Sequence, residues 1–220
     1  MILEPIYPVI LSTRIIADAH PELITGYGGD PARHRSLGLI TCDQDDPTYV
    51  AMDEATKHAP VDIIFARSFY AGSRHSSGKL SGEILAVMGG ADPDIIAEGM
   101  KAAIACLKHD ACFYNANDDG SIAVFPHVIA RPGNYFRSEV PLAEYDSMAY
   151  LVAPPLEATY GFEQALKSAA VKTLKLFPPP TETNYAALWL KGDLPSCQAA
   201  AETFARTVID VGQNPMVRIV

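Results

Sequence analysis

The feature that most constrains this chain is an internal repeat. GLITC at 38–42 in the first half corresponds to MAYLV at 148–152 in the second, and VDIIFA at 61–66 corresponds to VKTLKL at 171–176. All four are short apolar runs typical of strands, and each pair encloses a segment with helical spacing. A succession that occurs twice in one chain predicts two units of the same architecture.

The repeat continues with a further strand and a second helix in each half. Other corresponding pairs are RIIAD (14–18) with HVIAR (127–131), and EILAVMGGADP (83–93) with YAALWLKGDLP (185–195). Helices are expected at 94–107 and 196–209, where apolar and Ala positions recur at helical spacing. Pro93 and Pro195 suit the first turn of a helix, and Asp92 suits an N-cap. Each half therefore reads strand, strand, helix, strand, loop, strand, helix.

This order predicts an α+β fold built from two tandem, ferredoxin-like units, each a four-stranded sheet with two helices. With 220 residues the chain accommodates two domains of about 110 residues each. We place the first domain at 1–111 and the second at 112–220. The segment 134–146 is expected to be a linker or a loop of the second half.

Charge and hydropathy exclude several classes of function. The net charge is −9 and the Lys and Arg residues are scattered, so nucleic acid is not expected as a partner. The chain has no apolar run of about 18 residues and no basic stretch at its start, so neither a membrane span nor a signal peptide is expected. The acidic balance favours cationic or neutral small molecules.

Cysteine usage gives no sign of a metal site. Cys42, Cys106, Cys112 and Cys197 form no CxxC pair and are not accompanied by a histidine cluster. We expect reduced, mostly buried thiols and no structural metal. A Cys106–Cys112 disulfide stays open as an alternative.

Motifs of catalysis are also missing from the sequence. It contains no GxSxG, P-loop, HExxH or dinucleotide-binding fingerprint. The glycine-rich stretch TGYGGD at 25–30 is not followed by the GK[ST] of a phosphate-binding loop. The sequence therefore predicts no enzyme, although an amine-processing enzyme is kept as a third and weaker reading.

The repeat carries a recognisable pattern of an acid, three residues, Lys, one residue, Ala, one residue and Val. It stands as Asp53, Lys57, Ala59 and Val61 in the first half, and as Glu163, Lys167, Ala169 and Val171 in the second. This pattern resembles the bacterial microcompartment shell-protein domain. The Gly-Asp strand ending of that domain is clear in LKGDLPSCQAA, whereas the first half departs from it with MGGADPD.

Longer strings resemble one subtype, the tandem-domain shell proteins of ethanolamine utilisation. They are RSLGLI, DDPTYVAMDEATK, FARSFYAG, AYLVAPPLEATYG, ALKSA and PPPTETNY. The resemblance runs from about residue 6 to residue 218 of the printed sequence. It implies two circularly permuted shell domains in a homotrimer that imitates a hexamer, and it places Lys57 and Lys167 at the edge where tiles meet. The alternative is that both are ordinary lysines at helix C-termini.

The resemblance also implies a gated central pore. The loop at 67–82, rich in Gly and Ser, corresponds to the loop that faces the symmetry axis. We expect the gate there, at Phe69, Tyr70, Arg74 and His75. The alternative is a surface loop with no gating role. A metal ion at His75 or a cobalamin in the pore is left open, and no cofactor is otherwise expected.

Small off-centre pores that bind ethanolamine are a further implication of the resemblance. Their expected lining residues are Asp45, Asp46, Glu83, Phe113, Glu157, Thr183 and Asn184. An ammonium group has three donors and seeks carboxylates or carbonyls, and a hydroxyl suits Thr or Asn side chains. The alternative for Asp45, Asp46 and Glu157 is that they stabilise helix N-termini.

Taken together, the sequence predicts a structural tile of an ethanolamine-utilisation microcompartment shell, within the cytoplasm. Its expected partners are other copies of itself, other shell proteins and ethanolamine. The runner-up is a soluble amine-binding or regulatory module that does not tile.

Overall fold

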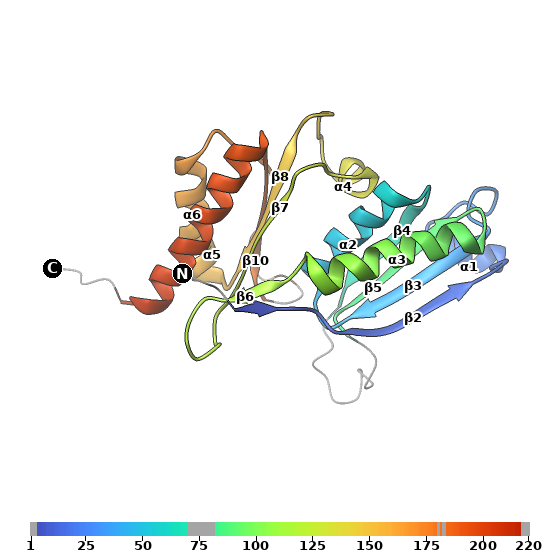
Figure 1. Ribbon diagram of the computed structural model, residues 1–220, viewed down its shortest axis with the longest axis horizontal. Coiled ribbons are helices and arrows are strands. Elements are labelled where there is room, and N and C mark those ends of the chain that lie inside the picture. The colour runs from blue at the N-terminus through green and yellow to red at the C-terminus, as the bar shows by residue number, and fades with distance from the viewer. Residues whose placement is uncertain (1–3, 70–81, 180, 182–183, 217–220) are drawn as a thin grey trace. The chain divides into compact units, whose positions relative to one another are not determined.

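The computed structural model of the protein describes residues 4–69, 82–179, 181 and 184–216 (Figure 1). Contacts divide the chain into two compact units. The N-terminal unit comprises Tyr7–Ala111 and Gly133–Glu139, and the C-terminal unit comprises the remainder of the described chain. The domain division at 1–111 and 112–220 stays a prediction. The compact units are not continuous in the sequence. The first strand, at Pro5–Ile6, belongs to the C-terminal unit, and the segment 133–139 belongs to the N-terminal unit.

The N-terminal unit is an antiparallel sheet with two long helices on one face (Figure 1). Its strands are β2 (Ile10–Ile16), β3 (Ser36–Cys42), β4 (Asp62–Ser68) and β5 (Ile84–Gly90), in the order β2-β3-β5-β4. The helices α2 (Asp45–His58) and α3 (Pro93–His109) pack against each other and against the sheet. Two short helices, α1 (Pro21–Gly26) and α4 (Asn134–Glu139), complete the unit.

The C-terminal unit has the same plan with a sheet extended at one edge. Its central strands are β7 (Ala123–Ile129), β8 (Ser147–Ala153), β9 (Lys172–Phe177) and β10 (Ala186–Gly192), in the order β7-β8-β10-β9. The short strands β1 (Pro5–Ile6) and β6 (Phe113–Asn115) are added beside β7. Helices α5 (Pro155–Ser168) and α6 (Leu194–Gln213) pack together on the sheet.

The predicted repeat and the α+β class are confirmed. The two repeats have the same element order along the chain, and their sheets have the same strand order and a shared irregularity. A β-bulge interrupts the pairing of β4 with β5 between Ile63 and Phe65, and the pairing of β9 with β10 is interrupted at the corresponding Thr173 and Lys175. The predicted cap is also confirmed, since the Asp92 side chain accepts hydrogen bonds from two backbone N–H groups at the start of α3.

The sheet of the N-terminal unit is packed on both faces. Gly38 of β3 points toward α3, where an added Cβ would approach Ile96 at 2.7 Å. On the opposite face Leu37 and Val87 form a small cluster with Ile24 of α1. In the C-terminal unit the helices are joined by the stacked rings of Phe162 and Phe204, whose centroids lie 5.4 Å apart.

Four short elements were not foreseen from the sequence. They are β1, α1, β6 and α4, and each is too short to show a hydrophobic period. The expectation of a linker or loop over 134–146 is wrong at its start, because 134–139 form α4. This helix packs on α2, where the Asp53 side chain binds its first turn.

Candidate functional site

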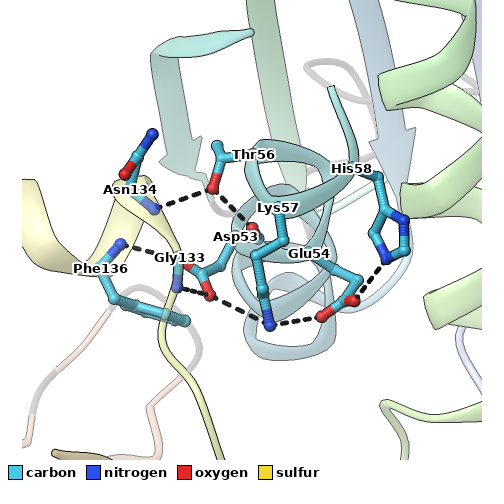
Figure 2. A network of polar contacts seen from close by, with 8 residues as sticks. All are labelled: Asp53, Glu54, Thr56, Lys57, His58, Gly133, Asn134 and Phe136. Atoms are coloured by element: carbon cyan, nitrogen blue, oxygen red, sulfur yellow. Dashed lines mark hydrogen bonds and ion pairs between the residues drawn. The ribbon is translucent and has the colours of Figure 1, made fainter. Parts of the chain in front are cut away.

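The first candidate site surrounds Lys57, in the last turn of α2 (Figure 2). Its ammonium nitrogen lies 2.5 Å from a carboxylate oxygen of Glu54 and 3.6 Å from one of Asp53. Glu54 also meets His58, at 3.0 Å. Burial raises the pKa of Glu54, but the hydrogen bonds and charges of Lys57 and His58 outweigh it, so the pKa is lowered. The lysine is thereby held along the helix, with 26% of its side chain exposed.

The neighbouring Asp53 holds the segment at 133–136. Its two carboxylate oxygens accept hydrogen bonds from the backbone N–H groups of Gly133, at 2.7 Å, and Phe136, at 3.0 Å (Figure 2). Burial raises the pKa of Asp53, while these two N–H groups and the charge of Lys57 oppose that rise by stabilising the carboxylate. The sequence pattern contained Asp53, but gave no sign of this role.

The corresponding lysine of the second repeat is exposed to solvent. Lys167 lies in the last turn of α5 and pairs with Glu163 at 2.5 Å, with 68% of its side chain exposed. The hydrogen bond with Glu163 raises the pKa of Lys167. The two lysines thus occupy the same place in the fold but differ in surroundings, and their role at a tile edge stays a prediction.

The second candidate site is a group of carboxylates in the N-terminal unit, where β3 ends and α2 begins. Asp45 and Asp46 are buried in the first turn of α2, where the helix dipole favours negative charge. They form the first turn of the helix, the place that the alternative reading of the sequence gives them. Asp43, which the sequence analysis did not select, accepts a hydrogen bond from the Val9 backbone N–H at 2.7 Å.

Glu83 joins this group because Cys42 at the end of β3 pairs with Ile84 at the start of β5. The half-buried Glu83 side chain therefore stands beside the start of α2. Burial, together with the negative charges of Asp45 and Asp43, raises the pKa of Glu83 to about 7. A carboxylate with this pKa changes its charge near neutral pH and would gain from a bound cation.

The residues expected to form the gate are described only in part. Tyr70, Arg74 and His75 lie outside the described residues. Phe69 is held at its backbone, since its N–H donates to the Glu83 carbonyl at 2.8 Å. Gly82, at φ +62, has a left-handed backbone, and an added Cβ would lie 2.2 Å from the Cys42 carbonyl oxygen.

The remaining expected ligand-binding residues lie in the C-terminal unit. Phe113 is buried, and its ring centroid lies 6.2 Å from that of Tyr185, the residue that follows Asn184 in the sequence. Asn184 has a φ of +61, the left-handed conformation that its counterpart Gly82 also adopts. Thr183 lies outside the described residues.

Glu157 is placed inside the first turn of α5 and does not precede the helix. The positions that correspond to Asp45 and Asp46 are Pro155 and Leu156, so the second repeat lacks this pair of carboxylates. The acidic group with Glu83 at its side is therefore specific to the N-terminal unit.

The four cysteines carry ordinary buried thiols. All four thiols are free and buried, as expected, and burial raises the pKa of Cys42 to about 11 and of Cys106 to about 12. Among the described residues no group of three His, Cys, Asp or Glu side chains is placed to hold a metal ion. No helix in the described part of the chain is long and apolar enough to cross a membrane.

Comparison with known proteins identifies the repeat unit. The model of the BMC domain matches residues 36–114. The EutL shell protein of Salmonella typhimurium is 43% identical over 219 residues, covering 98% of both chains. The EutL shell protein of Escherichia coli K12 is also 43% identical, over 216 residues and 98% of both chains.

Solved structures agree with these relatives. EutL from Clostridium perfringens superposes with a TM-score of 0.93 at 42% identity, covering 98% of both chains. EutL from Leptotrichia buccalis has the same TM-score at 39% identity, covering 99% of this chain and all of that one. The shell protein PduB, with a TM-score of 0.72 at 17% identity over 93% of this chain and 89% of that one, shares the fold.

Proposed function

The chain belongs to the EutL family of bacterial microcompartment shell proteins, and from that premise we propose that three copies assemble into one pseudo-hexagonal tile. It is a structural component of the shell of an ethanolamine-utilisation microcompartment, within the cytoplasm, and not an enzyme. The main support for this assembly is that both units of the chain have the same strand order. Three chains bring six such units, which suffice for a closed ring of hexagonal outline.

The tile meets its neighbours, other copies or other shell proteins, through Lys57 and Lys167. The exposed Lys167 tests this role better than Lys57, whose contacts with Asp53 and Glu54 also support the fold around α4. Electron microscopy of the purified protein should show extended sheets, and Lys167→Glu should abolish them while the tile stays intact. Lys101→Glu, on the exposed side of α3, is the matched control and should leave the sheets unchanged.

We place the ethanolamine site of the N-terminal unit at the group of carboxylates beside the start of α2. Asp45 and Glu83 would face its ammonium group in the N-terminal unit, and Glu157, Phe113, Thr183 and Asn184 are the residues assigned to it in the C-terminal unit. Support comes from the burial of Glu83 beside Asp45 and Asp43, which raises its pKa to about 7. Four heavy atoms at about −1.5 kcal/mol each limit the dissociation constant to some tens of micromolar. Such weak binding suits a pore whose sites must fill and empty.

Calorimetric titration tests the binding site. Asp45→Asn or Glu83→Gln should weaken ethanolamine binding without unfolding the protein, whereas Glu98→Gln on the exposed face of α3 should not. Unchanged binding by Glu83→Gln would remove that residue from the site. The gate at Phe69, Tyr70, Arg74 and His75, and any metal or cobalamin in the central pore, stay predictions that rest on the family alone.

A soluble amine-binding module that does not tile is the competing function. It shares the ethanolamine site but has no need of sheets or of the edge lysines. A protein that binds ethanolamine and forms no sheets under any condition would favour it. Turnover of ethanolamine by the purified protein would instead revive an enzymatic role.

A further inference from the structure

The β-bulge in β9 brings two lysines onto one face of the C-terminal sheet. Lys172 pairs with Lys191 of β10, and Lys175 pairs with Trp189, with a register shift between these two pairs. Lys172 and Lys175 are three residues apart, so a regular strand would direct them to opposite faces. Their partners on β10 are two residues apart, and the bulge therefore places both lysines on the face of Lys191.

This face of the sheet turns away from α5 and α6. The alternate residues of β10, Leu188 and Leu190, belong to the core that those two helices cover. Side chains alternate between the faces of a strand, so Lys191 projects to the other side of the sheet. Lys172 and Lys175 are both exposed to solvent, and the three lysines therefore form one group, which we call the β9–β10 lysine group.

Two members of the group stand directly opposite each other. In an antiparallel pair of strands, the Cβ atoms of such residues are about 4.5–5.5 Å apart, and like charges there are unfavourable. Lys191 is compensated, since its ammonium nitrogen lies 3.1 Å from a carboxylate oxygen of Asp146 and donates to the Pro141 carbonyl at 2.8 Å. The opposing Lys172 has no carboxylate partner within the described chain.

Aromatic rings hold the third member in place. The ammonium nitrogen of Lys175 lies 4.7 Å from the ring centroid of Phe177 and 5.7 Å from that of Trp189. A cation over an aromatic face is attracted by the ring, and two rings restrict where the ammonium group can lie. The rings leave its positive charge in place. The three lysines and Asp146 together carry a local charge of 3 − 1 = +2, in a chain whose net charge is −9.

The first repeat has no such group at the same place. The counterparts of Lys172 and Lys191 are Asp62 and Gly89, which also pair with each other across the strands. The Asp62 carboxylate forms an ion pair with Arg33, so the charges balance there. The excess of positive charge is therefore a property of the second repeat and does not follow from the shared fold.

We propose that the β9–β10 lysine group binds the diphosphate group of a small phosphorylated molecule. Each ammonium group offers three donors, and phosphate oxygens accept such charge-assisted hydrogen bonds. The lysine positions are about 5 Å apart across the strands and about 7 Å apart along them, so the long side chains can converge on two linked phosphate groups. This anion site is separate from the proposed ethanolamine site, which takes a cation, and it does not depend on assembly of the tile.

The sole tryptophan of the chain provides the readout, because Trp189 lies against Lys175. Titration of the full chain with inorganic pyrophosphate at low ionic strength should change the tryptophan fluorescence in a saturable way. Potassium chloride at matched ionic strength should not, since it screens charge without bridging the lysines. Orthophosphate should bind at least threefold more weakly than pyrophosphate. Equal binding of the two would contradict the assignment of a diphosphate group.

Substitutions identify the residues that bind. In titration calorimetry, Lys172→Gln and Lys175→Gln should each weaken pyrophosphate binding at least threefold, and the double variant at least tenfold. Both side chains are exposed, so the circular dichroism spectrum should not change. Lys108→Gln, in the last turn of α3, removes an exposed lysine of the other unit and should leave the dissociation constant unchanged. Equal effects of Lys172→Gln and Lys108→Gln would overturn the site.

Two further results would also overturn it. One is the lack of any saturable signal up to about 10 mM pyrophosphate, which is tenfold above a weak dissociation constant of about 1 mM. The other is tighter binding of a short oligoglutamate peptide than of pyrophosphate, because the lysine group would then receive an acidic peptide and not a phosphorylated small molecule.

Discussion

The buried carboxylate of Asp53 accepts a hydrogen bond at 2.7 Å from the backbone N–H of Gly133, which lies 80 residues further along the chain. A side chain of the first repeat thereby binds a segment that follows the first strand of the second. The same helix turn carries Lys57, so the packing of α4 and the position of the lysine depend on one another. The position of Lys57 at the predicted tile edge is consequently linked to the contact between Asp53 and Gly133, which are distant in the sequence.

Replacing the carboxylate should loosen α4. In Asp53→Asn only one oxygen remains to accept hydrogen bonds, so the backbone N–H of Gly133 or Phe136 loses its partner. Leaving a buried donor unpaired costs about 1–3 kcal/mol. We expect the free energy of unfolding, from urea denaturation at fixed protein concentration, to fall by about 2 kcal/mol. Hydrogen exchange should become faster at 133–139.

The control for this change is Glu98→Gln, which removes an exposed carboxylate on α3. It should change the free energy of unfolding by no more than about 0.5 kcal/mol. An equally small effect of Asp53→Asn would show that α4 is not held by this carboxylate.

Glycine at position 133 is required by close packing. A Cβ added there would lie 2.5 Å from the Thr56 hydroxyl oxygen and 2.6 Å from the Asp53 carbonyl oxygen, so the backbone of α4 must move. Gly133→Ala should therefore lower the free energy of unfolding by roughly 1–3 kcal/mol. Gly26→Ala, in the corresponding helix α1, meets no atom within 4 Å and should be neutral or slightly stabilising. Equal effects of the two changes would contradict the packing described.

Glu83 should make stability depend on pH. Its pKa of about 7 in the native state exceeds the ordinary value of 4.5, so between these values the native protein binds more protons than the unfolded chain. The free energy of unfolding should thus fall as pH rises from 5 to 8, by about 1 kcal/mol once solvent screening of this half-exposed group is allowed for. Glu83→Gln should remove that fall. If the free energy of unfolding of the wild type rises from pH 5 to 8, and that of Glu83→Gln changes in the same way, the proposed effect of Glu83 is refuted.

Ethanolamine binding should depend on pH in the opposite sense. The ionised form of Glu83 attracts the ammonium group, so titration calorimetry at pH 8 should give tighter binding than at pH 6, by about threefold to tenfold. In Glu83→Gln this ratio should approach one. A wild-type affinity that is the same at both values would mean that Glu83 does not face the ligand.

The sequence predicted those parts of the fold that local pattern determines. The strands around Leu39 and Ala149 follow from apolar runs, and the cap at Asp92 follows from a side chain suited to bind N-terminal backbone N–H groups. The docking of α4 could not be predicted, because it depends on Asp53 meeting Gly133 across a long stretch of chain. Periodicity carries no information about such a contact.

The residues of the candidate sites could likewise be predicted only in part. Asp45 and Asp46 were selected from a family pattern, yet their grouping with Glu83 arises only when β3 and β5 pair. Asp43 was missed for that reason, since nothing in its neighbourhood of the sequence distinguishes it. The difference in exposure between Lys57 and Lys167 could not be predicted either, because the sequence pattern around the two lysines is the same.

The mass of the protein in solution tests the central claim most directly. Light scattering on a sizing column should find a single species at about three times the chain mass of 23.7 kDa, the same over a tenfold range of concentration. A species that stays at 23.7 kDa under these conditions would contradict the trimeric tile and favour a binding module that does not assemble.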